Sequence, residues 1–553
     1  MSISHCEEIM KSLVRTLCGL LLFVTFVSGA SVQDEAESPR LILVLAIDQM
    51  RFDYLTRFDD LYTGGLRTLL DRGAIMTDAK YRHAATETGP GHSTLISGRH
   101  PSSSGIIANS WWDRLLGKVV NVVDDPFERP LGGAGRSASP VNFDGFTIGD
   151  ALKQNSPQSK VVGVSTKDRS AILMAGRLGD AAYWFERVEG NFITSTYYMD
   201  EAPGWLERWN GNRMADSYAG TAWTRLLGDD SLYWEYAGED AVVGEWTAED
   251  TVFPHRLPGN PPEPVYYNYL LRSPFADEMI LSVTLEAVRA HDIGEDDFTD
   301  ILAVSFSGTD LVGHEFGPDS QELMDQLLRL DRILGELFEE IDGGPGLDQT
   351  LVVLTADHGV VPLVETLEAE GVDARRATPQ AFRNALDRAL ADKYPGVEGL
   401  IAYGTVRGVY LNRELIRGSG LEVGAVEETI IEALLATGLV ATVYTRDQMI
   451  SNDPATDPYI DLFRNSFAST RSPDLMVRHN ENVYFDSAPG GTGHGTPYDY
   501  DRHVPIVFMG EGIEPGWYSE ACGPEDIAPT LALILGLEYP REPDSRLLLE
   551  ILK

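Results

Sequence analysis

Five short runs of aliphatic and β-branched residues constrain the fold of this chain more than any other sequence feature. They are Leu41–Ile47, Val161–Ser165, Ile301–Ser307, Leu351–Thr355 and Pro505–Phe508. Continuous apolar runs of this length are typical of strands buried on both faces of a parallel sheet. Helical patterns lie between them, for example over Gln321–Ile341 and Asp526–Leu535. The alternation predicts an α/β fold, a three-layer αβα sandwich with a mostly parallel central sheet.

Two regions interrupt this pattern and are predicted to be insertions into one catalytic domain that covers residues 31–553. Residues 180–275 contain six of the nine tryptophans among Tyr, Gly and Pro, with weak periodicity. They predict an aromatic-rich cap, which forms a small subdomain, a lid over the site, or both. Residues 375–450 predict a separate α+β module, with helices at Pro379–Lys393 and Val423–Thr437 and strands at Ala402–Leu411 and Val440–Thr445.

The first 30 residues have the pattern of a secretory signal peptide. Lys11 and Arg15 precede an apolar run over Leu17–Val27, and small residues that suit cleavage follow at Ser28-Gly29-Ala30. The run is too short to span a bilayer, although an N-terminal membrane anchor is the alternative interpretation. We expect an exported protein, periplasmic or as second choice secreted, with no stable membrane span after cleavage. Cys522 would be the single remaining cysteine, which excludes an intramolecular disulfide.

Acidic residues strongly outnumber basic ones. The formal net charge is −41, from 85 Asp and Glu against 44 Lys and Arg. A surface this acidic repels the phosphate backbone of nucleic acids, so we expect no nucleic-acid binding. The same field favours solubility and attracts cations. The sequence leaves the oligomeric state open, and a monomer is favoured.

Candidate metal ligands lie after the predicted strands, at the sheet edge where α/β folds bind ligands. They are three carboxylates and three imidazoles: Asp48, Asp310, His314, Asp357, His358 and His494. Asp310 and His314 have the i, i+4 spacing that places two side chains on one helix face, and His494 lies in a glycine-rich loop. Each residue alone also suits an ordinary turn or cap. Together they suit two zinc ions with nitrogen and oxygen ligands.

The segment Ala85–Gly98 supplies the candidate nucleophile. Gly-Pro-Gly at its centre ends the preceding structure, and Pro90 suits the first turn of a following helix. Thr88 would then lie at a helix N-terminus, where negative charge is stabilised. Bound zinc would lower the pKa of its hydroxyl and favour the alkoxide. A plain N-cap role is the alternative for Thr88, and Thr86 and Ser93 are rival hydroxyls.

These motifs together resemble the alkaline phosphatase superfamily from about Leu41 to the C-terminus. Within it they match the PafA-type, phosphate-insensitive bacterial alkaline phosphatases, relatives of the nucleotide pyrophosphatase/phosphodiesterases. The segment Glu525–Leu531 is similar to the last helix of that family. The resemblance implies an enzyme that hydrolyses small-molecule phosphate monoesters with two Zn²⁺ per chain, through a phospho-threonine intermediate.

The resemblance also implies a role for each site residue. One zinc ion would be held by Asp310, His314 and His494. The other would be held by Asp48, Asp357 and His358, and the oxygen of Thr88, the residue phosphorylated during turnover, would complete its ligands.

Three further residues would bind the transferred phosphoryl group. Asn109 would donate to a phosphoryl oxygen. Lys167 and Arg169 would be the basic pair of the monoesterase branch, which takes the place of a Mg²⁺ site. From the residues alone, a solvated pair beyond a strand end is the favoured interpretation of Lys167 and Arg169.

Other functions remain possible on this fold. A phosphodiesterase or nucleotide pyrophosphatase would share the zinc ligands and the threonine, but normally lacks the Lys/Arg pair. A non-catalytic, zinc-dependent ligand-binding protein would need a lost nucleophile or ligand, and none is missing. A sulfatase is disfavoured because the sequence has no Cys-x-Pro-x-Arg-like segment.

Overall fold

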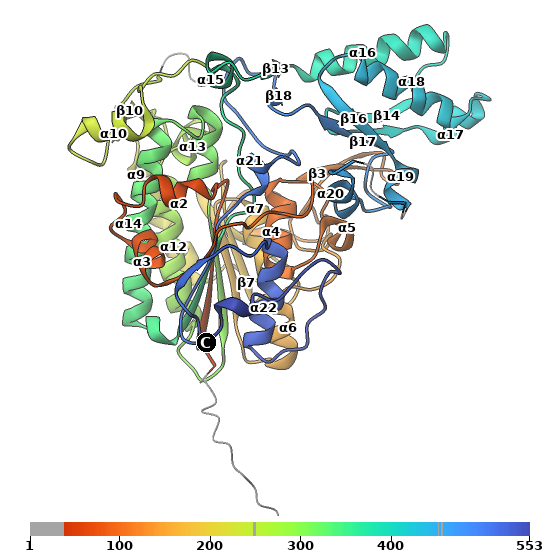
Figure 1. Cartoon of the computed structure of the whole chain (residues 1–553). Coiled ribbons are helices and arrows are strands. Elements are labelled where there is room, and N and C mark those ends of the chain that lie inside the picture. The colour runs from red at the N-terminus through yellow and green to blue at the C-terminus, as the bar shows by residue number, and fades with distance from the viewer. Residues whose placement is uncertain (1–37, 247–249, 452, 455–456) are drawn as a thin grey trace, which may run out of the picture. The chain divides into compact units, whose positions relative to one another are not determined.

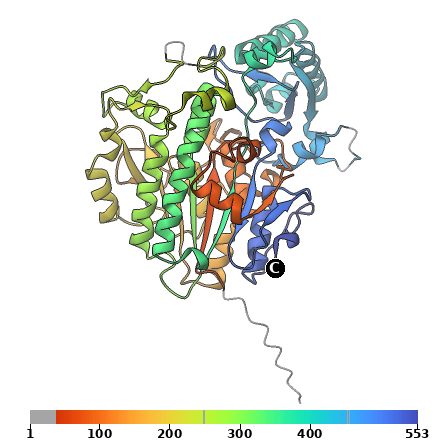
Figure 2. The same ribbon diagram turned by 60° about the vertical axis from the view of Figure 1, so that its left-hand side comes forward.

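The computed structural model describes residues 38–246, 250–451, 453–454 and 457–553, so the predicted signal peptide lies outside the described residues. Ten strands of the described part form one sheet in the order β20-β2-β19-β12-β1-β11-β6-β7-β8-β5. Their bounds are β1 (Leu41–Ile47), β2 (Ala74–Met76), β5 (Pro130–Leu131), β6 (Val161–Ser165), β7 (Ala181–Glu186), β8 (Asn191–Ser195), β11 (Asp300–Phe306), β12 (Thr350–Thr355), β19 (Ile506–Met509) and β20 (Gly516–Tyr518). Helices cover both faces of this sheet, which confirms the predicted αβα sandwich (Figure 1, Figure 2).

Strand β1 shows why such runs become central strands. All seven of its residues are buried, and they alternate between two cores on opposite faces of the sheet. The odd-numbered residues face a core with α3 (Gly65–Arg72), α12 (Phe275–His291) and α14 (Gln321–Gly343). The even-numbered residues face a core with α4 (Thr88–Ser97), α6 (Ile148–Asn155) and α22 (Ile527–Ile534). Burial on both faces therefore explains why the run is apolar at every position.

The carboxyl ends of four predicted strands meet at one edge of the sheet. β1 pairs in parallel with β11 and β12, and β11 pairs in parallel with β6. The residues that follow these strands are therefore brought together although they are far apart in sequence. This edge carries the candidate site.

Strand β19 corrects the expectation that the run at Pro505–Phe508 is parallel. It pairs antiparallel with β12, and its first residue, Ile506, lies opposite Thr355 at the carboxyl end of β12. The chain enters β19 from α21 (Asp499–Arg502), directly at the site edge. A parallel strand would need a crossover of a dozen or more residues back to the opposite edge, whereas only residues 503–505 lie between α21 and β19.

The aromatic-rich residues 180–275 pack onto the main core. β7 and β8 extend the central sheet beyond β6. Trp209, Trp223 and Tyr233 are buried in the same cluster as Leu43 of β1. The later elements of this range are α8 (Gly204–Gly211), α9 (Met214–Ser217), β9 (Ala222–Trp223), α10 (Asp230–Ala237), β10 (His255–Arg256) and α11 (Pro264–Leu271). The first strands of the range are thus part of the sheet itself.

The second predicted insertion contains a small α+β module with its own core. Its elements are α16 (Pro379–Lys393), β14 (Ile401–Thr405), β15 (Gly408–Leu411), α17 (Arg413–Gly418), α18 (Val423–Leu435), β16 (Val440–Thr445) and β17 (Leu475–His479). The single strand expected at Ala402–Leu411 is a hairpin, because the chain reverses at Val406 and Arg407. β17 lies beyond the predicted range and pairs between β15 and β16. In the described ranges, no helix has the length and apolarity needed to cross a bilayer.

Candidate active site

Thr88 is the first residue of α4, as the Gly-Pro-Gly pattern predicted. Its side chain is buried, and the first turn of α4 packs closely against the end of β12. A Cβ atom at Gly91 would lie 2.1 Å from the carbonyl oxygen of Asp357, so only glycine permits this approach. Gly91 therefore lets the first turn of α4, which carries Thr88, lie against Asp357, one of the candidate metal ligands.

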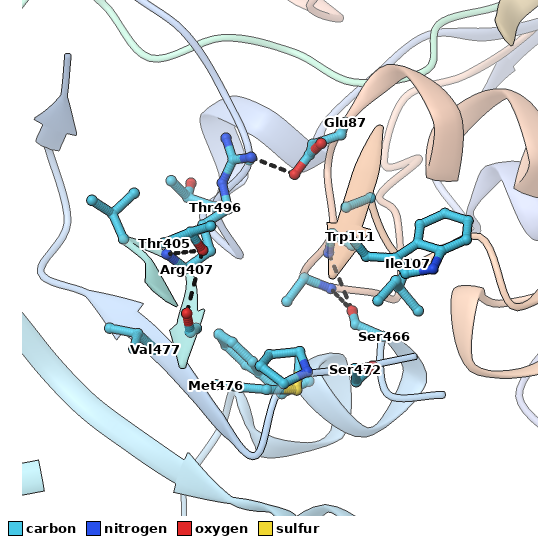
Figure 3. A pocket seen from close by; sticks show the side chains of 18 of the residues that line it. Glu87, Ile107, Trp111, Thr405, Arg407, Ser466, Ser472, Met476, Val477 and Thr496 are labelled. Carbon is cyan, nitrogen blue, oxygen red and sulfur yellow. Dashed lines mark hydrogen bonds and ion pairs between the residues drawn. The ribbon is translucent and has the colours of Figure 1, made fainter. Parts of the chain in front are cut away.

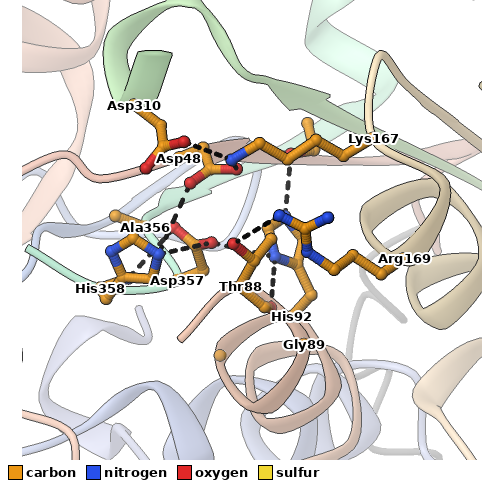
Figure 4. A network of polar contacts seen from close by, with 12 residues as sticks. Asp48, Thr88, Gly89, His92, Lys167, Arg169, Asp310, Ala356, Asp357 and His358 are labelled. Atoms are coloured by element: carbon orange, nitrogen blue, oxygen red, sulfur yellow. Dashed lines mark hydrogen bonds and ion pairs between the residues drawn. The ribbon is translucent and has the colours of Figure 1, made fainter. Parts of the chain in front are cut away.

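The hydrogen bonds of the three candidate hydroxyls distinguish them. Thr86 Oγ1 donates to the Thr496 carbonyl at 2.8 Å, and Ser93 Oγ donates to the Pro90 carbonyl at 2.9 Å. Thr88 Oγ1 instead accepts a hydrogen bond from Arg169 Nη2 at 3.3 Å (Figure 4). A guanidinium donor favours negative charge on the oxygen it contacts. The contacts therefore favour Thr88 over its two rivals as nucleophile.

One group of candidate ligands, called here the Asp310 group, consists of Asp310, His314 and His494. Asp310 and His314 lie on α13 (Gly308–Phe316), which follows β11, and His314 Nε2 is 3.1 Å from Asp310 Oδ1. His494 comes from the glycine-rich loop, with its Nε2 3.8 Å from the same oxygen. The i, i+4 spacing thus places both α13 side chains on one side of a potential ion.

The other group, called here the Asp48 group, consists of Asp48, Asp357 and His358. All three are buried at the ends of the adjacent strands β1 and β12. His358 Nε2 lies 3.6 Å from Asp48 Oδ1 and 3.4 Å from Asp357 Oδ2. The two groups adjoin, because the rings of His358 and His494 stack with centroids 3.5 Å apart.

All three histidines are held in the same way by backbone carbonyls. The Nδ1 contacts are His314 to Thr492 at 2.6 Å, His358 to Gly359 at 3.0 Å and His494 to Thr86 at 2.7 Å. A carbonyl oxygen can only accept, so each Nδ1 carries a proton, and Nε2 is the ring atom that faces the carboxylates. This arrangement is typical of metal-binding histidines, whose second nitrogen is fixed by a hydrogen bond.

The buried atoms of the Asp48 group suit a bound cation. Asp48 Oδ1, Asp357 Oδ2 and His358 Nε2 are buried without a hydrogen-bond partner among the described residues. Burial lowers the pKa of His358, so the ring is neutral, and burial together with nearby carboxylates raises the pKa of Asp48. Unpaired buried groups of this kind are costly unless a metal ion binds them. Six nitrogen and oxygen ligands without a cysteine fit two zinc ions.

Lys167 and Arg169 take different positions around the site. Lys167 precedes α7 (Asp168–Ala175), and its Nζ lies 2.6 Å from Asp48 Oδ2 and 2.5 Å from Asp310 Oδ2. Burial alone would lower the pKa of Lys167, but these two carboxylates outweigh it and raise the pKa. The ammonium therefore bridges the two ligand groups, whereas Arg169 contacts the nucleophile.

Asn109 lies opposite the start of α4. Its Oδ1 accepts from the backbone N–H of Gly89 at 2.7 Å, so the amide nitrogen is the end left to donate. Gly89 follows Thr88 directly, so the Asn109 side chain lies next to the backbone of the candidate nucleophile. The geometry suits the role that the family resemblance implies for Asn109.

Sequence reasoning missed two residues that hold the ligands. Gln49 adopts a left-handed backbone conformation, with φ of 69°. Its backbone N–H donates to Asp357 Oδ1 at 3.0 Å, and its side chain donates to Asp310 Oδ1 at 2.9 Å, so it joins both groups. His92 Nδ1 makes a 2.9 Å hydrogen bond with the Thr88 carbonyl and lies 3.2 Å from Asp357 Oδ2. Its place four residues after Thr88, on the same helix face, was the available signal.

An αβα sandwich that brings a helix-start hydroxyl and two histidine–carboxylate groups to one sheet edge is the architecture of a phosphatase-class enzyme. The chain matches the model of the type I phosphodiesterase / nucleotide pyrophosphatase family over residues 42–503. It therefore belongs to that family, within the alkaline phosphatase superfamily.

The relatives are similar over nearly the whole chain. Alkaline phosphatase PafA of Elizabethkingia meningoseptica is 33% identical over 531 residues, 94% of this chain and 96% of the relative. Alkaline phosphatase PhoV of Synechococcus elongatus is 30% identical over 98% of this chain and its own full length. The crystal structure of wild-type PafA superposes with a TM-score of 0.86 at 31% identity, covering 93% of this chain and 99% of that chain. These matches identify the chain as an enzyme of the phosphatase class.

Proposed function

We propose that this enzyme hydrolyses small-molecule phosphate monoesters through a phosphorylated Thr88, with two zinc ions per chain. The observation that carries the proposal is the buried Thr88 hydroxyl, which begins α4 and accepts a hydrogen bond from Arg169. Relatives named alkaline phosphatases, similar over nearly the full chain, support the monoesterase assignment.

The chain's own residues suffice to describe the transfer. The Oγ1–phosphorus bond of Thr88 forms as the ester P–O bond opposite it breaks, and the Thr88 proton ends on the released alcohol. Arg169 and the amide nitrogen of Asn109 donate to the non-bridging oxygens. Water then cleaves the phospho-threonine, which restores the hydroxyl and releases inorganic phosphate. Positioning and electrostatic stabilisation supply most of the acceleration in such transfers.

The two ligand groups would hold the metal ions. The Asp310 group would bind one ion and the Asp48 group the other. When bound, zinc ions lower the pKa of nearby hydroxyls and water and neutralise the charge that develops on attacking and leaving oxygens. Lys167 and Gln49 keep the carboxylates of both groups oriented toward one another.

One comparison tests the proposal: kcat/KM for an aryl phosphate monoester against a matched diester, in the presence of zinc. We expect the monoester to be preferred, because Arg169 and Lys167 place two cations at the site. Preference for the diester would favour the phosphodiesterase function found elsewhere in the family. Binding without turnover of either ester would favour a non-catalytic protein.

We also propose that the enzyme is exported to the periplasm after removal of residues 1–30. The sequence pattern of that segment supports this proposal. N-terminal sequencing of the protein from the periplasmic fraction tests it. A mature chain that begins at Met1 in the cytoplasm would contradict it.

A further inference from the structure

The hairpin of the α+β module reaches the candidate site through one arginine. Arg407 lies at the turn between β14 and β15. Its Nη1 bonds to Glu87 Oε1 (Figure 3). Its Nη2 donates to the carbonyl oxygen of His494 at 2.8 Å. Glu87 directly precedes the nucleophile, and His494 belongs to the Asp310 group. One guanidinium thus joins the nucleophile segment to the loop that supplies a metal ligand.

Glu87 carries the contact onward to the phosphoryl-binding residue. Its other oxygen, Oε2, accepts from the backbone N–H of Asn109 at 2.9 Å. Asn109 Oδ1 in turn accepts from Gly89 N–H at 2.7 Å. A continuous series of hydrogen bonds therefore connects Arg407, through Glu87 and Asn109, to the first turn of α4.

Arg407 is held in place by the surrounding backbone. Its N–H contacts Thr405 Oγ1 at 3.3 Å, and its carbonyl accepts from Val477 of β17 at 2.9 Å. Gly495 has φ of +105°, and a Cβ there would lie 2.3 Å from Arg407 Nη2. Glycine after His494 therefore permits both the backbone conformation and the approach of the guanidinium.

We propose that Arg407 is a positioning residue that fixes Asn109 and the His494 loop relative to Thr88, and so makes the module part of the catalytic unit. This proposal depends on the proposed function in one respect, because its tests measure the rate of ester hydrolysis. Arg407 acts through Glu87 and the His494 carbonyl rather than by touching substrate.

The contact has the geometry that only arginine provides. The Glu87 side chain is 8% exposed, so without its ion pair a buried carboxylate would reorient or draw in water. Two nitrogens of the planar guanidinium reach two different acceptors, whereas a lysine ammonium is a single point charge. Loss of partners that orient catalytic or metal-binding groups typically costs about 10- to 100-fold in activity.

The first test is a double-mutant cycle with Asn109, on whichever ester the wild-type enzyme hydrolyses faster. We expect Arg407→Ala to lower kcat/KM about 10- to 100-fold. In the Asn109→Ala background the same change should cost much less, because its effect passes through Asn109. A diester preference of the wild type would refute the monoester assignment without affecting this cycle.

The matched control is Arg413→Ala in the same module. Arg413 pairs with Asp474 at 2.8 Å and with Glu427 at 3.1 Å, within the module and its neighbouring loop. We expect this change to lower the thermal midpoint but to leave kcat/KM within about twofold. Equal losses of kcat/KM in the Arg413→Ala and Arg407→Ala variants would mean that Arg407 acts only by stabilising the module, which overturns the proposal.

Chemical rescue distinguishes a positioning role of the Arg407 guanidinium from a purely structural role. Added guanidinium can replace the missing group at the site, but it would not restore a generally destabilised module. A cavity of about 220 Å³ adjoins Arg407 and is lined by Glu87, Trp111 and Tyr403 among others (Figure 3). Free guanidinium should enter it and restore part of the activity of Arg407→Ala, while an equal concentration of sodium chloride should not. If Arg407→Ala fails to fold, Arg407→Lys serves instead, with a smaller loss expected.

The outcomes that overturn the proposal are specific. They are activity of Arg407→Ala or Arg407→Lys within twofold of wild type, or equal penalties in both Asn109 backgrounds together with unchanged zinc content. Reduced zinc content would instead support the part of the proposal that concerns the His494 loop.

Discussion

Arg169 is predicted to determine how strongly the enzyme prefers monoesters. Its guanidinium lies 3.3 Å from Thr88 Oγ1, at the position that non-bridging oxygens must approach when phosphorus bonds to that oxygen. A monoester presents three such oxygens, and a diester presents two. Truncation of Arg169 should therefore penalise the monoester selectively.

The size of the effect follows from the contact that is lost. A hydrogen bond to a charged group contributes about 1.5–3 kcal/mol, which corresponds to about 10- to 150-fold in rate. The Arg169 side chain is 22% exposed, so solvent screens it only in part. We expect Arg169→Ala to lower monoester kcat/KM by this factor, with a clearly smaller loss for the diester.

The assay compares an aryl monoester and a matched aryl diester with the same leaving group. The control is Arg177→Ala, just beyond the far end of α7, where the side chain donates to the Phe143 carbonyl at 3.2 Å. Zinc content is measured for each variant, so that metal loss is separated from loss of the cation. Equal losses on both esters would refute the assignment of Arg169 as a specificity residue.

Three further predictions follow from the structure. Thr88→Ala should lower kcat by about 10³-fold or more, whereas Thr86→Ala and Ser93→Ala should cost far less, as steady-state kinetics will show. Elemental analysis should find close to two zinc ions per chain, and full activity after exhaustive chelation would contradict the two-zinc mechanism. Burial raises the pKa of Asp277 to about 7, against about 3.9 in an unfolded chain. The stability contributed by protonated Asp277 is therefore full below about pH 4 and is lost as pH rises through about 7. Asp277→Asn, which removes the ionisable carboxyl, should flatten the pH dependence of thermal melts over that window.

The strands that carry the site could be predicted because burial on both faces imposes a continuous apolar run. β1 and β6 have the predicted bounds, β12 begins one residue earlier than predicted, and β11 begins and ends one residue earlier. The residues after these strands could then be grouped, because parallel strands bring their carboxyl ends to one edge. The antiparallel direction of β19 could not be predicted, because an apolar run has the same sequence pattern in either orientation.

The contacts of the module could not be predicted from local patterns. The turn at Val406 and Arg407 contains no Gly, Asn or Pro, so one strand was expected where a hairpin forms. Arg407 and its partner Glu87 are 320 positions apart. Such a pairing depends on how the module packs against α4, and neither periodicity nor composition encodes that packing.

The charges at the site connect the metal requirement with the preference for monoesters. Asp48, Asp310 and Asp357 contribute three negative charges, against the cations Lys167 and Arg169, which leaves one net negative charge. Two divalent ions change this balance to three net positive charges. A monoester dianion together with a Thr88 alkoxide carries three negative charges, so the loaded site would be neutral. A diester with the same alkoxide carries two and leaves one positive charge unbalanced in a buried site, where uncompensated charge is costly. On the proposed two-zinc mechanism, Lys167 would therefore influence substrate choice through the total charge, in addition to its contacts with Asp48 and Asp310.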